Sequence, residues 1–121
     1  MYTRRIESLN ISPSMLGFGC MRFPTLPDGK IDEVKSTAMI EKAMAEGVNY
    51  IDTAYPYHNG DSEPFGGRVL KSHKRDSFFL ATKLPVWLIK SRGDVRKLLN
   101  EQLKRLQVDY IDFYLLHALD G

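Results

Sequence analysis

Three short apolar runs in this sequence each end on a side chain that can carry a charge or exchange a proton. These side chains are Asp52, Lys83 and His117. Singly, each has an ordinary explanation: Asp52 could cap a turn, Lys83 could be a solvated loop lysine, and His117 could be a hydrogen-bonded histidine at a strand end. An acid or base at the tip of an apolar strand is costly unless it is paired or solvated. Three apolar runs that each end on an acid or a base therefore indicate a site for proton-transfer chemistry.

Two tyrosines, Tyr55 and Tyr57, follow Asp52 closely and are candidate proton donors. A phenol is a weak acid at neutral pH, and a neighbouring ammonium group stabilises its phenolate form. Lys83 is the candidate for that ammonium group, and Asp52 would pair with it. Such a set suits the reduction of a carbonyl group, which needs a hydride at carbon and a proton at an oxygen that His117 would orient. In the simpler interpretation, both tyrosines pack the edge of the sheet as loop aromatics.

The segments that must position these side chains alternate between strands and helices. Apolar runs predict strands at residues 16–23, 48–53, 78–82 and 110–116. Helical periodicity predicts helices at residues 31–46, 62–72 and 94–106. In the first helix we expect Asp32 to be the N-cap and Gly47 to adopt the left-handed conformation after the last turn. The third helix is the clearest, with an expected buried face that comprises Val95, Leu98, Leu99, Leu103 and Leu106.

Strands that alternate with helices of this length predict right-handed βαβ units and a parallel sheet with both faces covered. Four strands and three helices are half of a (β/α)8 barrel, which takes about 250 residues. We therefore expect an α/β fold of the TIM-barrel type, of which residues 1–121 form a single amino-terminal part with the first four β/α units. A small hairpin over residues 3–13, with Asn10 and Ser12 near its turn, would precede them. The carboxyl ends of barrel strands form the active face.

Four motifs at these positions together resemble the aldo-keto reductase family. They are LGFGCMR on the first strand, GVNYIDTAYPYHNGDSE on the second, ATKL on the third and DYIDFYLLH on the fourth. The resemblance runs from about residue 6 to residue 117, nearly the whole chain. The opening GFGCMRFP also resembles a branch whose members often carry an iron–sulfur, ferredoxin-like domain at the carboxyl end.

This resemblance implies an oxidoreductase that transfers a hydride between NADPH and an aldehyde or ketone, with NADH not excluded. It also implies the catalytic residues Asp52, Tyr57, Lys83 and His117. In the family pattern the acid is the tyrosine five residues after the aspartate, which favours Tyr57 over Tyr55.

The resemblance further implies a cofactor site formed by Gly19, Cys20, Met21 and Asp52, near the nicotinamide and its ribose. Plain strand packing with a bulge is the alternative for the glycine-bearing segment.

Two other pairs are assigned more loosely. Ser62 and Glu63 match the family's SE pair or, equally well, a helix N-cap. His58 is expected in a pocket wall and His73 on the surface.

Composition excludes several other classes of protein. The net charge of +2 gives no reason to expect a nucleic acid or an anionic membrane as partner, and the basic stretch at residues 71–75 is expected to be solvated. No run approaches the length of a membrane-spanning helix. Three histidines without ligand spacing and the lone Cys20 give no metal site and no internal disulfide. A cytoplasmic protein is expected.

Two alternatives concern the chain as a whole. The fold could serve as a cofactor-binding regulatory subunit or pseudoenzyme, although the complete set of four catalytic-type residues favours an enzyme. A half barrel exposes two sheet edges and much of the barrel interior, which favours either pairing with another chain, as in a homodimer, or aggregation. The resemblance assigns the main phosphate- and adenine-binding residues to the other half of the barrel. We therefore expect the chain alone to bind NADPH poorly and to turn over slowly or not at all.

Overall fold

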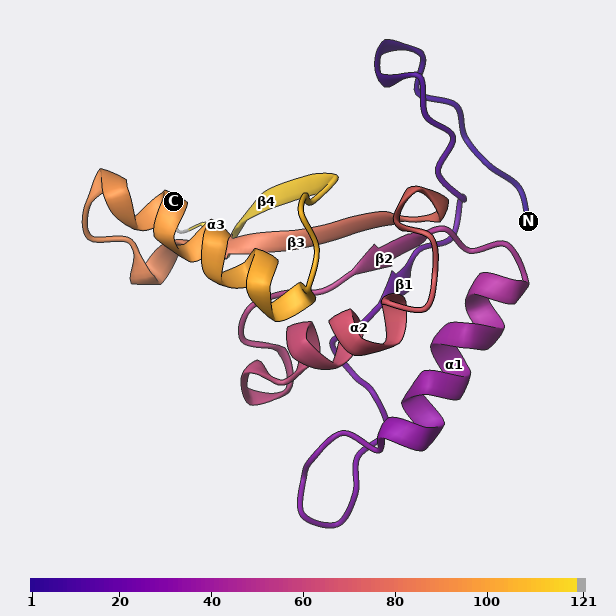
Figure 1. The fold of residues 1–121 in the computed structure, drawn as a ribbon, viewed down its shortest axis with the longest axis horizontal. Helices are drawn as coiled ribbons and strands as arrows, with labels where there is room; N and C mark the ends of the chain where they lie inside the picture. Colours follow the sequence, from indigo (N-terminus) through magenta and orange to yellow (C-terminus); the bar gives the residue numbers. More distant parts are fainter. Residues whose placement is uncertain (120–121) are drawn as a thin grey trace.

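The computed structural model describes residues 1–119 and contains one parallel sheet with helices between its strands (Figure 1). The four strands lie in the order β1-β2-β3-β4, and every neighbouring pair is parallel. The strands are β1 (Phe18–Gly19), β2 (Tyr50–Asp52), β3 (Phe79–Pro85) and β4 (Phe113–His117). The helices are α1 (Glu33–Ala45), α2 (Ser62–Leu70) and α3 (Arg92–Leu106), with short 3-10 turns at Glu7–Leu9, Tyr57–Gly60, Arg75–Ser77 and Val86–Leu88. The predicted order of elements is confirmed.

An irregular antiparallel hairpin precedes the sheet, as expected. Isolated bridges join Thr3 to Ser14 and Ile6 to Ile11, and its turn is the 3-10 segment Glu7–Leu9. Asn10 follows the turn with a φ of 53°, a left-handed conformation that asparagine tolerates better than most residues. In Figure 1 this segment projects from one end of the sheet, away from the three helices.

Local signals at the helix ends explain their positions. The side chain of Asp32 accepts a hydrogen bond from the backbone N–H of Lys35 at 3.2 Å, so the predicted N-cap of α1 is confirmed. Gly47 has a φ of 99°, which suits the glycine expected after this helix. At the start of α3, the carboxylate of Asp94 accepts from the backbone N–H of Ser91 at 3.1 Å.

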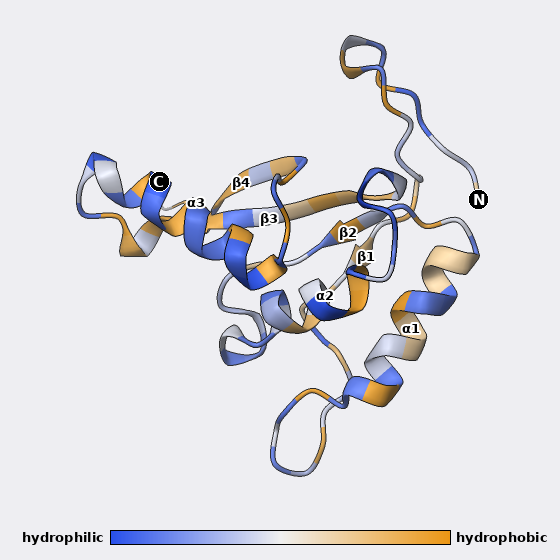
Figure 2. Cartoon of the chain, viewed as in Figure 1, coloured by the Kyte–Doolittle hydropathy of each residue, from blue (hydrophilic) through white to orange (hydrophobic). Residues whose placement is uncertain are grey.

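The core lies between the sheet and the helices. It contains Ile40 of α1, Phe65 of α2, Leu106 of α3, and the buried strand residues Ile51 and Leu80. Figure 2 shows largely hydrophobic strands, whereas each helix carries both hydrophobic and hydrophilic residues. Burial of one helix stripe against the sheet is the main source of helix stability in such a fold.

The expected buried face of α3 is wrong in part. Leu98 and Leu106 are buried, but Val95 is 39% exposed, and the polar Gln102 is fully buried between the two leucines. The buried residues are spaced by four, which is the stripe that faces α2 and β3. A polar side chain therefore occupies a position that the apolar pattern did not mark.

All four strands begin later than predicted, and β1 and β2 also end earlier than the expected runs 16–23 and 48–53. The third was expected to stop before Lys83, but β3 continues to Pro85, because its backbone pairs with β4 along its whole second half. The fourth was expected to begin at Tyr110. Instead Asp112 and the carbonyl of Tyr110 bind the guanidinium of Arg75, at 2.7 and 2.8 Å, before the strand starts at Phe113. Arg75 is thus not part of a solvated loop.

No helix within residues 1–119 combines the length and apolar character needed to span a bilayer.

Helix α2 approaches α3 closely at a glycine. A Cβ atom placed on Gly67 would lie 2.6 Å from the carbonyl oxygen and 2.7 Å from the carbonyl carbon of Leu106. The neighbouring Gly66 has open space instead, with no described atom within 4 Å of such a Cβ. Two adjacent glycines of one helix thus have different roles, close packing at Gly67 and none at Gly66.

Substitution of these two glycines tests the packing. Gly67→Ala should lower the free energy of unfolding by about 1–3 kcal/mol, because backbone atoms of α3 cannot move aside cheaply. Gly66→Ala, the matched control, should raise it by about 0.5–1 kcal/mol through helix propensity. Urea denaturation of both variants measures the difference. An equal effect of the two substitutions would contradict the close contact.

Candidate active site

The sheet brings the predicted polar side chains to the carboxyl ends of neighbouring strands. Asp52 ends β2, Lys83 lies two residues before the end of β3, and His117 ends β4. The register places Gly19 beside Asp52 and Pro85 beside His117. Residues that are far apart in the sequence therefore meet at one edge because the strands are parallel and adjacent.

The ammonium group of Lys83 is held by three oxygen atoms. Its Nζ lies 3.1 and 3.0 Å from the two carboxylate oxygens of Asp52 and 2.7 Å from the carbonyl oxygen of Thr53. The Lys83 side chain is 15% exposed and that of Asp52 is 34% exposed. An ammonium has three protons to donate, so this arrangement satisfies all of them and fixes the position of the charge. Partial burial makes this ion pair stronger than an exposed one.

Tyr57 packs over this charge. The Nζ of Lys83 lies 4.9 Å from the centre of the Tyr57 ring, within the range of a cation–π contact. The ring of His117 lies 6.0 Å from that of Tyr57 and nearly perpendicular to it, at 85°. The four side chains predicted to be catalytic therefore form one cluster.

His117 is half-buried between this cluster and Trp87. The two rings lie 5.3 Å apart at an angle of 64°. Burial and the charge of Lys83 lower the pKa of His117, and the carboxylate of Asp52 only partly opposes this effect. Its buried Nδ1 has no hydrogen-bond partner within residues 1–119. The lowered pKa favours the neutral imidazole, and its unpartnered Nδ1 is buried.

Tyr55, the rival of Tyr57, points away from the cluster. Its hydroxyl donates to the carboxylate of Glu101 at 3.1 Å, and its ring lies under the guanidinium of Arg105 at 4.4 Å. Burial and the bond to Glu101 raise the pKa of Tyr55. Both contacts are with α3, so of the two tyrosines only Tyr57 lies beside Lys83 and His117.

The residues assigned to the cofactor differ in their availability. Gly19 is exposed, and a Cβ placed on it would meet no described atom within 4 Å. Met21 is 52% exposed. Cys20 is buried in the core: its N–H donates to the Asp52 carbonyl at 2.8 Å, and its carbonyl accepts from Ser62 at 2.9 Å. Burial, with a smaller contribution from Asp52, raises the pKa of its thiol to about 12. The cofactor assignments stay predictions, and Cys20 has no side-chain atom at the open edge.

A network of buried polar side chains lies behind the cluster, and the sequence did not reveal it. Glu63 is fully buried, and its Oε2 accepts from the hydroxyl of Thr82 at 2.7 Å and from the amide of Gln102 at 3.0 Å. The same amide donates to the backbone carbonyl of Lys83 at 2.8 Å. Burial raises the pKa of Glu63, although Thr82, Gln102 and Arg105 oppose the shift. The sequence signal that could have indicated this network is Gln102, a polar residue within the apolar stripe of α3.

Of the two weaker assignments, one requires correction. Ser62 is not an N-cap, because α2 begins at this residue and its hydroxyl instead bonds to Thr53 and to the Cys20 carbonyl, both at 2.9 Å. His73, expected on the surface, is partly exposed, and its Nε2 lies 3.0 Å from both carboxylate oxygens of Glu41.

His58, expected in a pocket wall, connects two loops. Its Nε2 accepts from the backbone N–H of Phe23 at 2.9 Å, and its ring stacks on that of Phe23 with centroids 5.6 Å apart. Burial lowers the pKa of His58, which keeps the ring neutral and able to accept this bond. The histidine thereby ties the loop of Tyr57 to the segment after β1.

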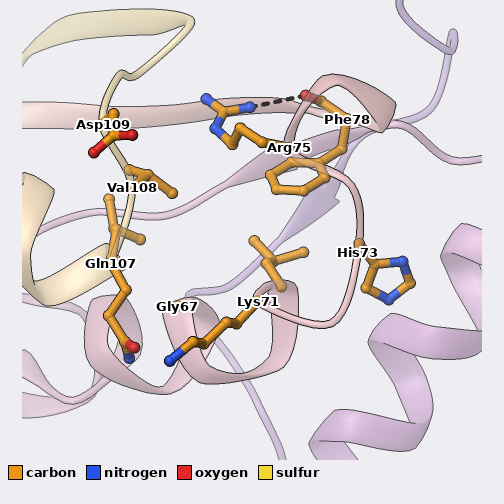
Figure 3. Close-up of a pocket in the computed structure, with 10 residues that line it drawn as sticks. Gly67, Lys71, His73, Arg75, Phe78, Gln107, Val108 and Asp109 are labelled. Carbon is orange, nitrogen blue, oxygen red and sulfur yellow. Dashed lines mark hydrogen bonds between the residues drawn. The ribbon is translucent and has the colours of Figure 1, made fainter.

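A pocket of about 160 Å³ lies at the other end of the sheet, between the ends of α2 and α3 and the start of β3 (Figure 3). Lys71, His73 and Arg75 contribute cationic or basic groups to its wall, and Asp109 contributes an acidic one. The guanidinium of Arg75 is already bound to the carbonyl of Phe78 at 3.1 Å and to Asp112.

Within residues 1–119, no group of three or more His, Cys, Asp or Glu side chains is arranged to hold a metal ion.

Comparison with known proteins points to one family for this arrangement. The solved aldo-keto reductase AKR11C1 from Bacillus halodurans, in its holo form, has a TM-score of 0.78 and 34% identity, and the alignment covers 95% of this chain and 40% of that one. An aldo/keto reductase from Klebsiella pneumoniae, solved with NADP and acetate, has a TM-score of 0.74 and 25% identity over 89% of this chain and 36% of that one.

Curated relatives agree with the solved structures. Aldo-keto reductase YhdN of Bacillus subtilis is 36% identical over 95% of this chain, and methylglyoxal reductase DkgA of Salmonella typhimurium is 36% identical over 93%. The chain spans 37% and 36% of their respective lengths, so these relatives are much longer than the segment they share with it. The model of the aldo/keto reductase family matches residues 15–121. This chain belongs to the aldo/keto reductase family.

Proposed function

We propose that the cluster of Asp52, Tyr57, Lys83 and His117 reduces the carbonyl group of a small aldehyde or ketone with a reduced nicotinamide cofactor. The observation that carries this proposal is the Lys83 ammonium, held by Asp52 on one side and lying 4.9 Å from the centre of the Tyr57 ring on the other. A fixed positive charge beside a phenol stabilises the phenolate that proton donation leaves behind, and so favours general acid catalysis by tyrosine.

Each residue has a distinct role in this proposal. Tyr57 donates its hydroxyl proton to the carbonyl oxygen, and the ammonium of Lys83 stabilises the phenolate that is left. Asp52 holds the ammonium in place. Neutral His117 donates a hydrogen bond from a ring N–H to the substrate oxygen and so fixes its orientation. Proton transfer of this kind contributes roughly 10²–10⁴-fold to the rate.

The open strand end beside Asp52 fits the nicotinamide part of NADPH or NADH. Gly19 lacks a side chain and has empty space in front of it, and Met21 is exposed next to it. The bound cofactor would supply the hydride that reaches the carbonyl carbon. The NADP complex of the Klebsiella pneumoniae relative supports this choice, and NADPH is the cofactor we propose. The complete set of four residues favours an enzyme over a regulatory cofactor-binding module.

Self-association of the chain stays a prediction. Leu115 and Leu116 of β4 are 45% and 57% exposed, and apolar residues on an edge strand favour pairing with another chain. We expect a homodimer, which light scattering would detect as a doubled mass. A monomer at every concentration tested would contradict this expectation.

Titration of His117 tests the electrostatics of the cluster. Because its pKa is lowered, His117 should become protonated only at a pH below its ordinary value, as measured by NMR of the imidazole. Lys83→Met removes one cause of the lowering and should raise the pKa. Asp52→Asn removes the opposing carboxylate and should lower it further. Shifts of the same sign in both variants would contradict this account.

The proposed reaction can be tested by carbonyl-dependent oxidation of NADPH, with methylglyoxal, other aldehydes and quinones as substrates. We would assay the chain alone and a chimera in which it replaces the matching segment of YhdN. Tyr57→Phe should lower kcat by at least about 100-fold, because the proton donor is lost. Tyr55→Phe, the matched control, should retain most of the activity. A folded chimera that is inactive, or one that Tyr57→Phe leaves unchanged, would contradict the proposal.

A further inference from the structure

The loop that carries Tyr57 has an unfavourable backbone. His58 and Asn59 have φ values of 53° and 54°, and Gly60 has a φ of 92°, so three consecutive residues lie in the left-handed region. Residues with a Cβ atom rarely adopt this conformation and keep it only when their surroundings determine it. Contacts outside the loop must therefore hold residues 55–60 in place.

Arg105 supplies three of these contacts. Its guanidinium donates to the backbone carbonyl of Tyr55 at 3.1 Å and to that of Gly60 at 2.5 Å, and it also lies over the Tyr55 ring. The two carbonyls lie on either side of Tyr57 in the chain. Because one planar cation binds both, it fixes the separation of the two ends of the loop.

Glu63 in turn fixes Arg105. The Nε of Arg105 lies 3.1 Å from Oε1 of Glu63, an ion-pair contact without hydrogen-bond geometry; the Glu63 side chain is fully buried, and 20% of the Arg105 side chain is exposed. The other carboxylate oxygen is bound by Thr82 and Gln102. The guanidinium is thus attached to the core of the domain, and it connects the rigid packing of α2, α3 and β3 to the loop.

We propose that Arg105 and Glu63 form a positioning pair that holds Tyr57 over Lys83 and against His117. Neither residue touches the substrate; both act through the backbone of residues 55–60. The inference rests on the proposed function only for its catalytic consequence. The bond from Phe23 to His58 attaches the loop independently of Arg105, so loss of the pair should loosen the loop rather than unfold the domain.

The test uses variants that avoid an unpaired buried charge. Arg105→Met combined with Glu63→Gln removes both charges and all guanidinium donors. Arg105→Lys keeps the charge but loses the planar fork. The matched control is Arg68→Met combined with Glu33→Gln, which removes an Arg–Glu pair of similar length, 2.9 Å, on the exposed outer surface. Circular dichroism and urea denaturation would establish that each variant is folded.

Two NMR measurements on the chain report the position of Tyr57 directly. In the double variant at positions 105 and 63, amide exchange of residues 55–61 should become faster by roughly tenfold or more, since the loop opens locally. Nuclear Overhauser contacts from the Tyr57 ring to Lys83 and to His117 should weaken or vanish. Arg105→Lys should give an intermediate result, and the control pair should match the unmodified chain. Unchanged exchange and contacts in a folded double variant would overturn the proposal.

Activity separates this proposal from the proposed function. In the chimera with YhdN, the double variant should lower kcat by roughly 10–100-fold with a smaller change in KM, because displacement of an acid impairs the chemical step more than binding. If the contacts vanish but Tyr57→Phe leaves reduction unchanged, the positioning role stands and the proposed function fails. If Tyr57→Phe abolishes reduction but the double variant alters neither contacts nor kcat, the reverse holds.

Discussion

The ion pair between Lys83 and Asp52 is the interaction on which the rest of the site depends. A lysine within a strand, surrounded by buried residues, would lose hydration energy without nearby acceptors. The neighbouring strand supplies the carboxylate of Asp52 and the carbonyl of Thr53, so all three ammonium protons are bound. A shift of the register between β2 and β3 by one residue would reverse the face of each side chain and break the pair. Sheet pairing and the proposed chemistry are therefore specified by the same contacts.

Much of this arrangement could be predicted from sequence because it depends on strand ends. Apolar runs that stop at Asp52 and His117 located the edge where the cluster forms, and the parallel order of the strands brought both residues together. Lys83 was expected just after the end of the third strand. It lies inside β3 instead, because pairing with β4 continues past it to Pro85. Strand length depends on the partner strand, which local sequence does not describe.

The buried polar network could not be predicted in the same way. Glu63, Thr82 and Gln102 lie 19 to 39 residues apart, and hydrogen bonds between them depend on how α2 and α3 pack on the sheet. Each looks unremarkable by itself: a glutamate in a first helical turn, a threonine in a strand, a glutamine in a helix. Only the structure shows that the Glu63 carboxylate is fully buried and that polar partners satisfy it. The sequence pattern marked Ser62 and Glu63 as the family's SE pair or as a helix N-cap, and neither interpretation includes the buried hydrogen bonds of Glu63.

The single cysteine has a consequence for how the molecule can be observed. Cys20 is the only thiol in the sequence, is 1% exposed, and sits where the segment after β1 meets the first residue of α2. Because Cys20 is buried, its sulfur reaches solvent only when the surrounding core opens, and burial raises the pKa of its thiol to about 12. Cys20 is therefore a natural reporter group. The rate at which a thiol reagent labels it measures how often the domain opens beside Asp52.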